Sequence, residues 1–483
     1  MQTRRDRVQA YNFTVGRLGT AMLEADPDAA DQPMRRTRTG NYLGVAIGAL
    51  ICVGFLVWGL IFPGGATSWQ QEGRLVVEKN SGATYLYGSG ELRPVANYAS
   101  ARLASQGEPQ VSRVTAESLD GVRVGSRIGI PGAPDALPNA ETAADNLWRL
   151  CALPPGEDGK GRSALTVGPD PGPGIPLRDK ALLVAGPDGD RHLLWDGRRL
   201  RIDAEGGALQ ALGYGTAPAT AVPEEFLEAV PAAPDLSAPD VAGAGEQGPA
   251  IAGAPSRVGQ VFAVAAPEGR EDQHYLLTRD GLVPLTLTDA LLLLADLDVT
   301  AAAYPGGDPA AVAIPAGEAN ANLASGAEPA RPPDSGIPAS PPETAPLDAG
   351  VAPCLVPSSG DLALAVYAVG SITAWTVPES TGVAPGCPTP DRIGIPTGAG
   401  GVATASPVGG TADASSAYLV TDTPAKYRIP SEEALTALGY QASDAQQVPT
   451  SLLRLLPTGP VLSPAQAARP VAEAEGGGEG GCP

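Results

Sequence analysis

The chain has 483 residues and carries 32 Lys and Arg against 53 Asp and Glu, a formal net charge of −21. Residues 1–40 hold 7 of the basic and 5 of the acidic side chains, so the remainder has a net charge of −23. This acidity excludes nucleic-acid binding by the larger part, because too few cations are available to neutralise phosphates. With 61 Gly and 50 Pro, we expect loop-rich, strand-containing domains joined by extended segments.

Residues 4–25 repeat apolar side chains at three- and four-residue steps, which predicts a basic amphipathic helix. Such a helix either docks on a partner at the cytoplasmic membrane face or lies on the lipid, and a solvated basic leader is the alternative. The regularity of the apolar positions favours docking. The apolar stripe consists of Val8, Tyr11, Val15, Leu18 and Met22, and the arginines available to the other faces are Arg4, Arg5, Arg7 and Arg17.

Residues 42–62 contain no charged side chain. As a helix this stretch reaches about 31 Å, the thickness of a bilayer's hydrocarbon core. A cleaved signal peptide is the rival interpretation, but the run is too long and starts too late for one. Arg35, Arg36 and Arg38 precede the span, whereas the first basic residue after it is Arg74. The positive-inside rule therefore predicts a single membrane pass at 41–63, with residues 1–40 in the cytoplasm and the bulk outside.

Beyond the span, four segments share one pattern: an apolar strand, a polar turn, a second apolar strand, a Gly or Asp turn and then a short helix. These segments are 75–103, 181–230, 261–295 and 417–456. The second and fourth also share ALQALGY (208–214) with ALTALGY (434–440), then VPEEFL (222–227) with VPTSLL (448–453). The last pair predicts short helices opened by proline. RIGIP recurs at 127–131 and 392–396, which predicts extended chain crossing between units.

The predicted fold class is α+β, with one N-terminal transmembrane helix followed by four small β-hairpin/helix repeats around a central β-rich region. We expect repeats at 64–125, 181–240, 257–302 and 414–462. The central region takes 126–180 and 303–413, and 463–483 forms a flexible tail. The Pro/Gly/Ala-rich segments 231–256 and 303–350 bury too little apolar surface to order themselves alone.

The sequence contains no motif typical of catalysis or of cofactor binding. His192 and His274 fall on the same strand of the second and third repeats, where the first and fourth have Tyr85 and Tyr418, which favours strand packing over catalysis. The loop around Lys160 has Pro in place of the first glycine of a phosphate loop and Gly in place of its Ser/Thr. We therefore predict no catalytic, cofactor-binding or metal-binding residues, and a protein that is not an enzyme.

Five cysteines are present. Cys52 lies in the span, and Cys151, Cys354, Cys387 and Cys482 lie in the disulfide-permissive outer region. A Cys151–Cys354 bond would remove the most entropy from the unfolded chain, on the order of 4–5 kcal/mol. Cys354–Cys387 is the local alternative. The residues leave this choice open, together with the state of Cys387 and Cys482.

Three pieces of sequence carry a family resemblance: RRDRVQAYNFTVGRLGTAML (4–23), the arginines at 35–38 directly before a single span, and GRLVVEKNSGATYLYGSGELRPVANYASARL (73–103). In these pieces the chain resembles the EccB family, a core membrane component of the type VII (ESX) secretion system of actinobacteria. Cys151 and Cys354 fall where that family has its two bridged cysteines. The resemblance thus implies a Cys151–Cys354 disulfide.

The resemblance also implies an elongated outer domain of four repeats around a central β-rich region. It implies assembly in the inner membrane with the EccC motor ATPase, EccD, EccE and the mycosin protease, in a hexamer-based pore complex. An ATPase role proposed for the family finds no nucleotide motif in this chain. We expect a structural core subunit of the secretion complex without a cofactor; the alternatives are an extracytoplasmic hydrolase, acting on nucleotides or cell wall, and a wall-binding anchor.

Overall fold

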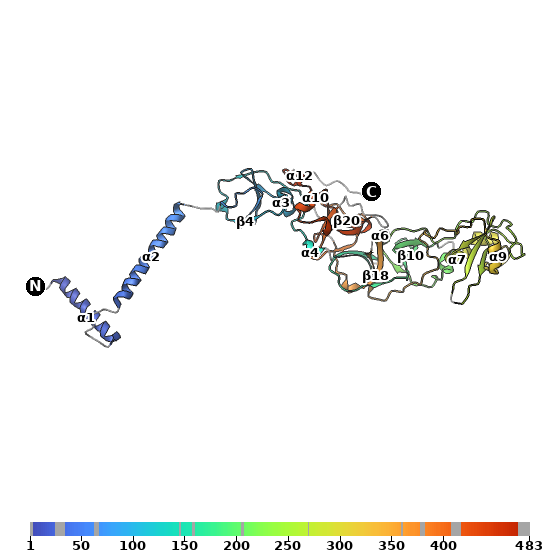
Figure 1. The fold of residues 1–483 in the computed structure, drawn as a ribbon, viewed down its shortest axis with the longest axis horizontal. Coiled ribbons are helices and arrows are strands. Elements are labelled where there is room, and N and C mark those ends of the chain that lie inside the picture. The colour runs from blue at the N-terminus through green and yellow to red at the C-terminus, as the bar shows by residue number, and fades with distance from the viewer. Residues whose placement is uncertain are drawn as a thin grey trace. The chain divides into compact units, whose positions relative to one another are not determined.

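The computed structural model (Figure 1) describes residues 3–24, 34–61, 67–143, 146–156, 160–203, 207–268, 270–358, 361–376, 382–406 and 417–471. Within these residues the fold is mixed α and β, with one long apolar helix near the N-terminus followed by several small sheets, as predicted. The chain forms two compact units. The first unit comprises residues 1–70, 77–83 and 112–122, and the second comprises the rest.

The first unit contains two long helices, α1 (Arg4–Glu24) and α2 (Met34–Ile61). Helix α1 matches the predicted amphipathic segment. Helix α2 covers the described part of the predicted span and begins eight residues before it, so that Arg35, Arg36 and Arg38 belong to the same helix. The added residues include Met34 and three arginines and contain no proline, and methionine and arginine lose little side-chain freedom in a helix.

Four small sheets share one strand order, in which three consecutive strands lie side by side and a later strand lies beside the first. In the second to fourth sheets this later strand is parallel to the first. A further strand, β5 (Arg123–Val124), extends the first sheet beside its third strand. The strands are β1 (Arg74–Glu78), β2 (Thr84–Gly88), β3 (Glu91–Pro94) and β4 (Val111–Val114); β9 (Leu182–Ala185), β10 (Arg191–Trp195), β11 (Arg198–Arg201) and β12 (Thr220–Ala221); β13 (Val261–Val264), β14 (Gln273–Thr278), β15 (Gly281–Leu285) and β16 (Val312–Ala313); and β20 (Gly401–Ser406), β21 (Ala417–Thr421), β22 (Ala425–Ile429) and β23 (Gln446–Pro449).

Two predicted repeat boundaries are wrong. The fourth sheet starts with β20 at Gly401, inside the stretch assigned to the central region, and the third sheet ends with β16, beyond residue 302. Both strands join their sheets by long-range pairing, which local periodicity does not reveal. The predicted tail also starts too early, because α12 (Pro464–Ala467) is an ordered helix whose Ala467 is fully buried.

Helices follow the third strand of each small sheet and begin at side-chain caps where the sequence supplies one. Asn97, Thr286 and Ser431 each accept a hydrogen bond from the backbone N–H three residues on, which satisfies an otherwise unpaired donor of the first turn. The helices are α3 (Tyr98–Ser105), α4 (Ala140–Ala143), α5 (Ala208–Ala211), α6 (Glu224–Ala229), α7 (Leu287–Ala295), α8 (Leu297–Ala303), α9 (Ala316–Ala321), α10 (Glu432–Ala437), α11 (Thr450–Leu453) and α12, with 3₁₀ turns at Ala116–Ser118, Val369–Ser371 and Ala442–Asp444.

A six-stranded central sheet joins the two stretches predicted as the central region. Its order is β19-β7-β6-β17-β18-β8. One face packs on a large apolar core to which α6 contributes Phe226 and α11 contributes Leu452. The recurring VPEEFL and VPTSLL segments are therefore the helices that attach the second and fourth sheets to the central one. The strands are β6 (Leu147–Leu153), β7 (Arg162–Gly168), β8 (Ile175–Pro176), β17 (Val351–Ser358), β18 (Asp361–Ala368) and β19 (Arg392–Gly394).

Helix contacts join the small sheets in pairs, and one pair consists of the first and the last sheet in the chain. Helix α3 of the first packs on α10 and α12 of the fourth, and α7 of the third packs on α5 of the second. Arg102 Nε on α3 donates to the Ala437 carbonyl at the end of α10 (3.1 Å). The two ALxALGY motifs have matching roles: Tyr214 Oη donates to Pro342 O (2.9 Å), and Tyr440 Oη to Pro138 O (2.6 Å). Each tyrosine thus holds the chain that enters β17 or β6.

The Pro/Gly/Ala-rich segments 231–256 and 303–350 are ordered by contacts with other segments. Arg331 Nε donates to Asp289 Oδ1 on α7 (2.9 Å), and its Nη2 donates to Ser237 O (2.9 Å). Asp289 is almost fully buried and also accepts from Thr286 Oγ1 (2.8 Å). One arginine therefore joins both segments to the third sheet, in agreement with the expectation that neither segment orders itself alone.

Lys426 on β22 lies under the end of α11. Its Nζ donates to the carbonyl oxygens of Leu453 and Leu456 (2.8 and 2.9 Å), which satisfies two acceptors at a helix C-terminus. Burial lowers the pKa of Lys426 to about 8. The charged form is therefore disfavoured in the folded protein despite these hydrogen bonds.

Lys426 is expected to make stability rise with pH between about pH 8 and pH 10.5, the folded and ordinary pKa values. In this window the unfolded chain binds more protons than the folded one, so the free energy of unfolding increases by at most about 3 kcal/mol. Denaturant unfolding at pH 7.5, 9 and 10 measures the rise, and Lys426→Met should remove it. An equal rise in both proteins would contradict the assignment.

Candidate functional site

The apolar stripe predicted on α1 is uncovered in this chain. Its five side chains are between 51% (Val15) and 83% (Met22) exposed. At 3.6 residues per turn they fall within an arc of about 80° of the helix surface. Exposed apolar surface of this kind marks a binding face for protein or lipid.

Two features of α1 differ from the prediction. Arg4 falls inside the arc of the stripe, because it lies four residues before Val8, whereas Arg5, Arg7 and Arg17 lie outside it. Phe13, which was not predicted, is 64% exposed on another face, and the Arg17 guanidinium carbon lies 5.9 Å from its ring centroid. A phenylalanine outside the three- and four-residue pattern gives no periodic signal.

Helix α2 is long and apolar enough to cross a membrane over Arg36–Gly59, with a mean hydropathy of 2.1. None of that window is buried inside the protein, so α2 is not a core helix. Cys52 within it is a free, exposed cysteine. Phe62, at the end of the predicted span, lies outside the described residues.

Cys151 and Cys354 form the disulfide implied by the family resemblance. They are directly opposed on the neighbouring strands β6 and β17 and are fully buried. The bond thus joins the two hairpins at the middle of the central sheet. Cys387 is also disulfide-bonded, and Cys482 lies outside the described residues.

The two histidines lie on the second strand of their sheets, as predicted, but they do not share one position. Counted back from the hairpin turn, His192 on β10 matches Tyr85, Tyr418 and Tyr275. His274 is one residue earlier on β14 and therefore faces the opposite side of its sheet. The dipeptides His274-Tyr275 and His192-Leu193 look alike in sequence. Only the strand register shows that the two histidines occupy different positions.

No metal site is found in the described part of the chain: no three His, Cys, Asp or Glu side chains there are grouped to hold an ion. The loop before Lys160 lies partly outside the described residues, at 157–159. Its described ends are joined by the Gly156 N–H, which donates to Lys160 O (3.2 Å).

A pocket of about 380 Å³ opens where the β10–β11 turn meets the edge of the central sheet. The turn has Asp196 and Gly197 at φ values of 46° and 68°, which two-residue hairpins favour. A Cβ on Gly197 would lie 2.4 Å from the Leu362 carbonyl oxygen, so this close approach requires glycine. No sequence motif could have revealed the pocket, because its lining comes from four distant segments.

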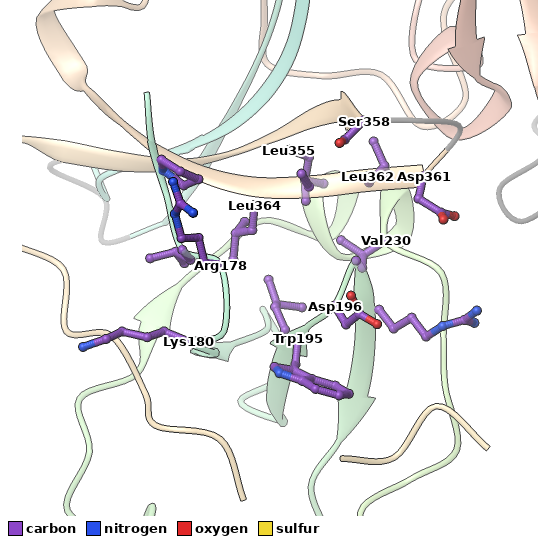
Figure 2. A pocket seen from close by; sticks show the side chains of 16 residues that line it. Arg178, Lys180, Trp195, Asp196, Val230, Leu355, Ser358, Asp361, Leu362 and Leu364 are labelled. Atoms are coloured by element: carbon purple, nitrogen blue, oxygen red, sulfur yellow. The ribbon is translucent and has the colours of Figure 1, made fainter. Parts of the chain in front are cut away.

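The pocket has an apolar floor and a charged rim (Figure 2). Leu362 and Leu364 lie on one side and Trp195 on the other. The rim has three cationic side chains and two carboxylates. It therefore has no strong preference for anionic or for cationic ligands. The lining contains no histidine or cysteine. The rim residues are Arg178, Lys180, Arg198, Asp196 and Asp361.

Residues 1–472 match the protein family described as "Type VII secretion system ESX-1, transport TM domain B", which is EccB. This chain belongs to the EccB family. The match takes in α1, α2 and all five sheets. It confirms the family suggested by residues 4–23 and 73–103.

Two curated EccB relatives from Mycolicibacterium smegmatis illustrate the similarity. The "ESX-1 secretion system ATPase EccB1" is 30% identical over 305 residues, covering 61% of this chain and 62% of the relative. The "ESX-3 secretion system ATPase EccB3" is 31% identical over 298 residues, covering 60% and 56%. The chain therefore spans about three fifths of the length of these relatives.

Two solved structures share the fold. The EccB3 dimer from the ESX-3 core complex matches with a TM-score of 0.62 and 26% identity, covering 83% of this chain and 100% of that one. A chain of the intact ESX-5 inner membrane complex matches with a TM-score of 0.61 and 23% identity, covering 100% and 98%. At 23% identity the second likeness concerns the fold alone.

Proposed function

We propose that this EccB chain is a structural core subunit of a type VII secretion membrane complex, which it anchors and helps to assemble for protein export. The family match over residues 1–472 carries this proposal, because it includes both N-terminal helices as well as the sheets. The uncovered stripe of α1 and the span-length α2 support it. In this role α1 engages partners on the cytoplasmic side, α2 crosses the inner membrane, and the acidic sheets assemble outside.

The proposed orientation places residues 1–40 in the cytoplasm and the chain after residue 63 on the extracytoplasmic, periplasmic side. Three arginines at the start of α2 support it through the positive-inside rule. The buried Cys151–Cys354 disulfide supports it too, since such bonds persist in oxidising compartments.

The proposed outer domain is an elongated array of four repeats around the central sheet. The shared strand order of the four small sheets supports a common repeat unit. The proposed partners are sister copies, an EccC-like ATPase, EccD, EccE and a mycosin protease, in a hexamer-based complex. The solved EccB3 dimer supports pairing with sister copies, and the solved ESX-5 inner membrane complex supports membership of a larger membrane assembly.

Removing the apolar stripe of α1 is expected to abolish complex assembly while membrane insertion stays intact. Deleting residues 4–24 tests the whole helix, and Tyr11→Ser with Leu18→Ser tests the stripe alone. Native gels and co-purification with mass spectrometry measure assembly; carbonate extraction measures insertion.

Phe13→Ser is the matched control, because Phe13 is as exposed as the stripe residues but lies on another face. Phe13→Ser and Tyr11→Ser alone each remove one exposed aromatic ring, so only a stripe-specific contact separates these two single variants. Normal assembly without residues 4–24, or equal loss in the Phe13 variant, would contradict the proposed role.

ATP hydrolysis is a second candidate, favoured by the word ATPase in the names of both curated relatives. It predicts turnover by the purified chain that a single acidic substitution abolishes. Assembly defects without any change in hydrolysis would favour the structural role.

A further inference from the structure

Arg149 on β6 is a buried cation without a counter-ion. Only 5% of the residue is exposed, and its Nε and Nη1 have no hydrogen-bond partner in the described part of the chain. Among the described residues no carboxylate forms an ion pair with its guanidinium, in contrast to the buried Arg331, which pairs with Asp289. An arginine cannot escape this situation by losing its proton, because its guanidinium stays charged in proteins. A buried charge of this kind is strongly unfavourable unless something balances it.

The side chains that surround Arg149 supply no negative charge. Successive residues of a strand face opposite sides of the sheet, so Arg149 shares its face with Leu147 and Cys151. The Tyr367 ring centroid lies 4.9 Å from the guanidinium carbon, and this cation–π contact offsets only part of the desolvation. The cluster on this face is apolar and aromatic: it consists of Cys151, Cys354, Ala365 and Tyr367, with Leu147, Val356 and Ile372 packed against it.

Thr166 on β7 adds an unpaired hydroxyl beside the guanidinium. It is the direct partner of Arg149 in the antiparallel pairing of β6 with β7, and the side chains of such partners are neighbours on one face. Thr166 is 4% exposed, and its Oγ1 has no hydrogen-bond partner among the described residues. A guanidinium only donates hydrogen bonds, and a hydroxyl can donate one. The two side chains therefore present buried donors that a negatively charged acceptor satisfies.

Asp170 acts on Arg149 from outside this buried position. Burial lowers the pKa of Arg149, whereas Tyr367 and Asp170 act in the opposite direction. Asp170 is exposed, however, and its Oδ1 accepts a hydrogen bond from the Gly172 N–H (3.0 Å) in its own loop. Its carboxylate is thus held at the surface, where it does not satisfy Nε or Nη1 of Arg149.

We propose that Arg149 and Thr166 form a buried site for one small monovalent anion, of the size of chloride or formate. The anion accepts hydrogen bonds from the guanidinium and from Thr166 Oγ1, and its charge balances that of Arg149. One guanidinium balances one negative charge and Asp170 repels a second, so a divalent anion is disfavoured. A water molecule would satisfy the same hydrogen bonds but would leave the guanidinium charge unbalanced.

Anion binding is tested by the melting temperature of the full chain in detergent micelles. Sodium chloride or sodium formate replaces sodium gluconate at constant ionic strength, because gluconate is too bulky for a buried site. An anion at ten times its dissociation constant raises the ratio of folded to unfolded chain about 11-fold. The melting temperature should therefore rise with chloride or with formate. No rise with either anion, as expected of a site that holds only water, would overturn the proposal.

Two variants test the residues of the site. Arg149→Met should abolish the anion-dependent rise, and Thr166→Val, which keeps the shape of the side chain, should raise the dissociation constant roughly 2- to 10-fold by removing one hydrogen bond. Arg201→Met is the matched control, because it removes the same charge from an exposed ion pair with Asp235 and should keep the wild-type rise. An equal rise in the wild type and Arg149→Met would reveal a general salt effect and overturn the proposal.

NMR locates the anion on the same full chain. Arginine Nε–H signals are recorded on ¹⁵N-labelled protein, and Arg149→Lys, which keeps the positive charge, assigns the signal of Arg149. Chloride or formate should shift this signal until it saturates, whereas the signal of the exposed Arg201 should stay in place. An Arg149 signal that does not move would place any anion elsewhere and would overturn the proposal.

Asp170→Asn decides whether Asp170 itself occupies the site in solution. With the carboxylate held outside, its removal abolishes a repulsion and should lower the dissociation constant for chloride. A chloride response that appears only in Asp170→Asn would show that Asp170 pairs with Arg149 in the wild type, which would overturn the proposal. Because all these readouts use the isolated chain, they are independent of whether the protein assembles into a secretion complex.

Discussion

Replacing both Cys151 and Cys354 with alanine is expected to lower the free energy of unfolding by about 4–5 kcal/mol. The bond joins positions 203 residues apart, so the intact disulfide removes a large loop-closure entropy from the unfolded chain. It also holds β6 opposite β17, the strand pairing that joins the two central hairpins. Alanine suits this fully buried site because it adds no polar group.

Denaturant unfolding under oxidising conditions, followed by tryptophan fluorescence, measures this loss. Cys52→Ala serves as the control, since Cys52 is free and lies in the exposed helix α2. Reducing agent should bring the wild-type chain close to the reduced double variant, because the bond of Cys387 is then lost in both. A loss under about 1 kcal/mol would mean that other contacts already constrain the unfolded chain as strongly as the bond does.

Arg331→Met is expected to destabilise the protein by about 3–5 kcal/mol, the cost of leaving a buried charge without its partner. Asp289 is only 2% exposed in its side chain, and Arg331 is 15% exposed. Loss of the guanidinium also removes the side-chain donor to Ser237 O in the 231–256 segment. Limited proteolysis should therefore find new cleavage in 231–256 and 303–350.

Arg201→Met is the matched control for this prediction. Its ion pair with Asp235 has a short N–O distance of 2.6 Å, but both side chains are about half exposed. Solvent screens such a pair, so its loss should cost about 1 kcal/mol or less. A second comparison is Arg331→Met with Asp289→Leu, which should regain part of the stability because no buried charge remains. Equal losses of stability in Arg331→Met and Arg201→Met would contradict the stabilising role of the buried Arg331–Asp289 ion pair.

Local signals in the sequence predicted the elements that depend on near neighbours. The charge-free run of 42–62 predicted α2, the spacing of Val8 to Met22 predicted α1, and the Gly or Asp turns of the repeats predicted hairpins. Each of these depends on residues within about one or two helical turns or one hairpin. Family membership was likewise accessible, because the leader and the 73–103 run are contiguous.

Local sequence signals could not predict several parts of the candidate site. The Cys151–Cys354 pair came from the family resemblance, since loop entropy alone left Cys387 as an alternative. Phe13 on α1 and the rim of the sheet-edge pocket gave no pattern at all. His192 and His274 seemed equivalent, and the strand register showed that they face opposite sides.

Periodicity, charge and turn residues act over short distances, so the amino-acid order alone was enough to predict the long apolar helix α2, the helix α1 and the hairpins. The pairing of the sheets, the joining of two remote hairpins in one central sheet and the ordering of the Pro/Gly/Ala-rich segments became apparent only in the folded chain. Those outcomes depend on contacts such as Arg331 with Asp289 and Tyr214 with Pro342. Residues that are far apart in the chain leave no shared period, so their meeting appears only once the chain has folded.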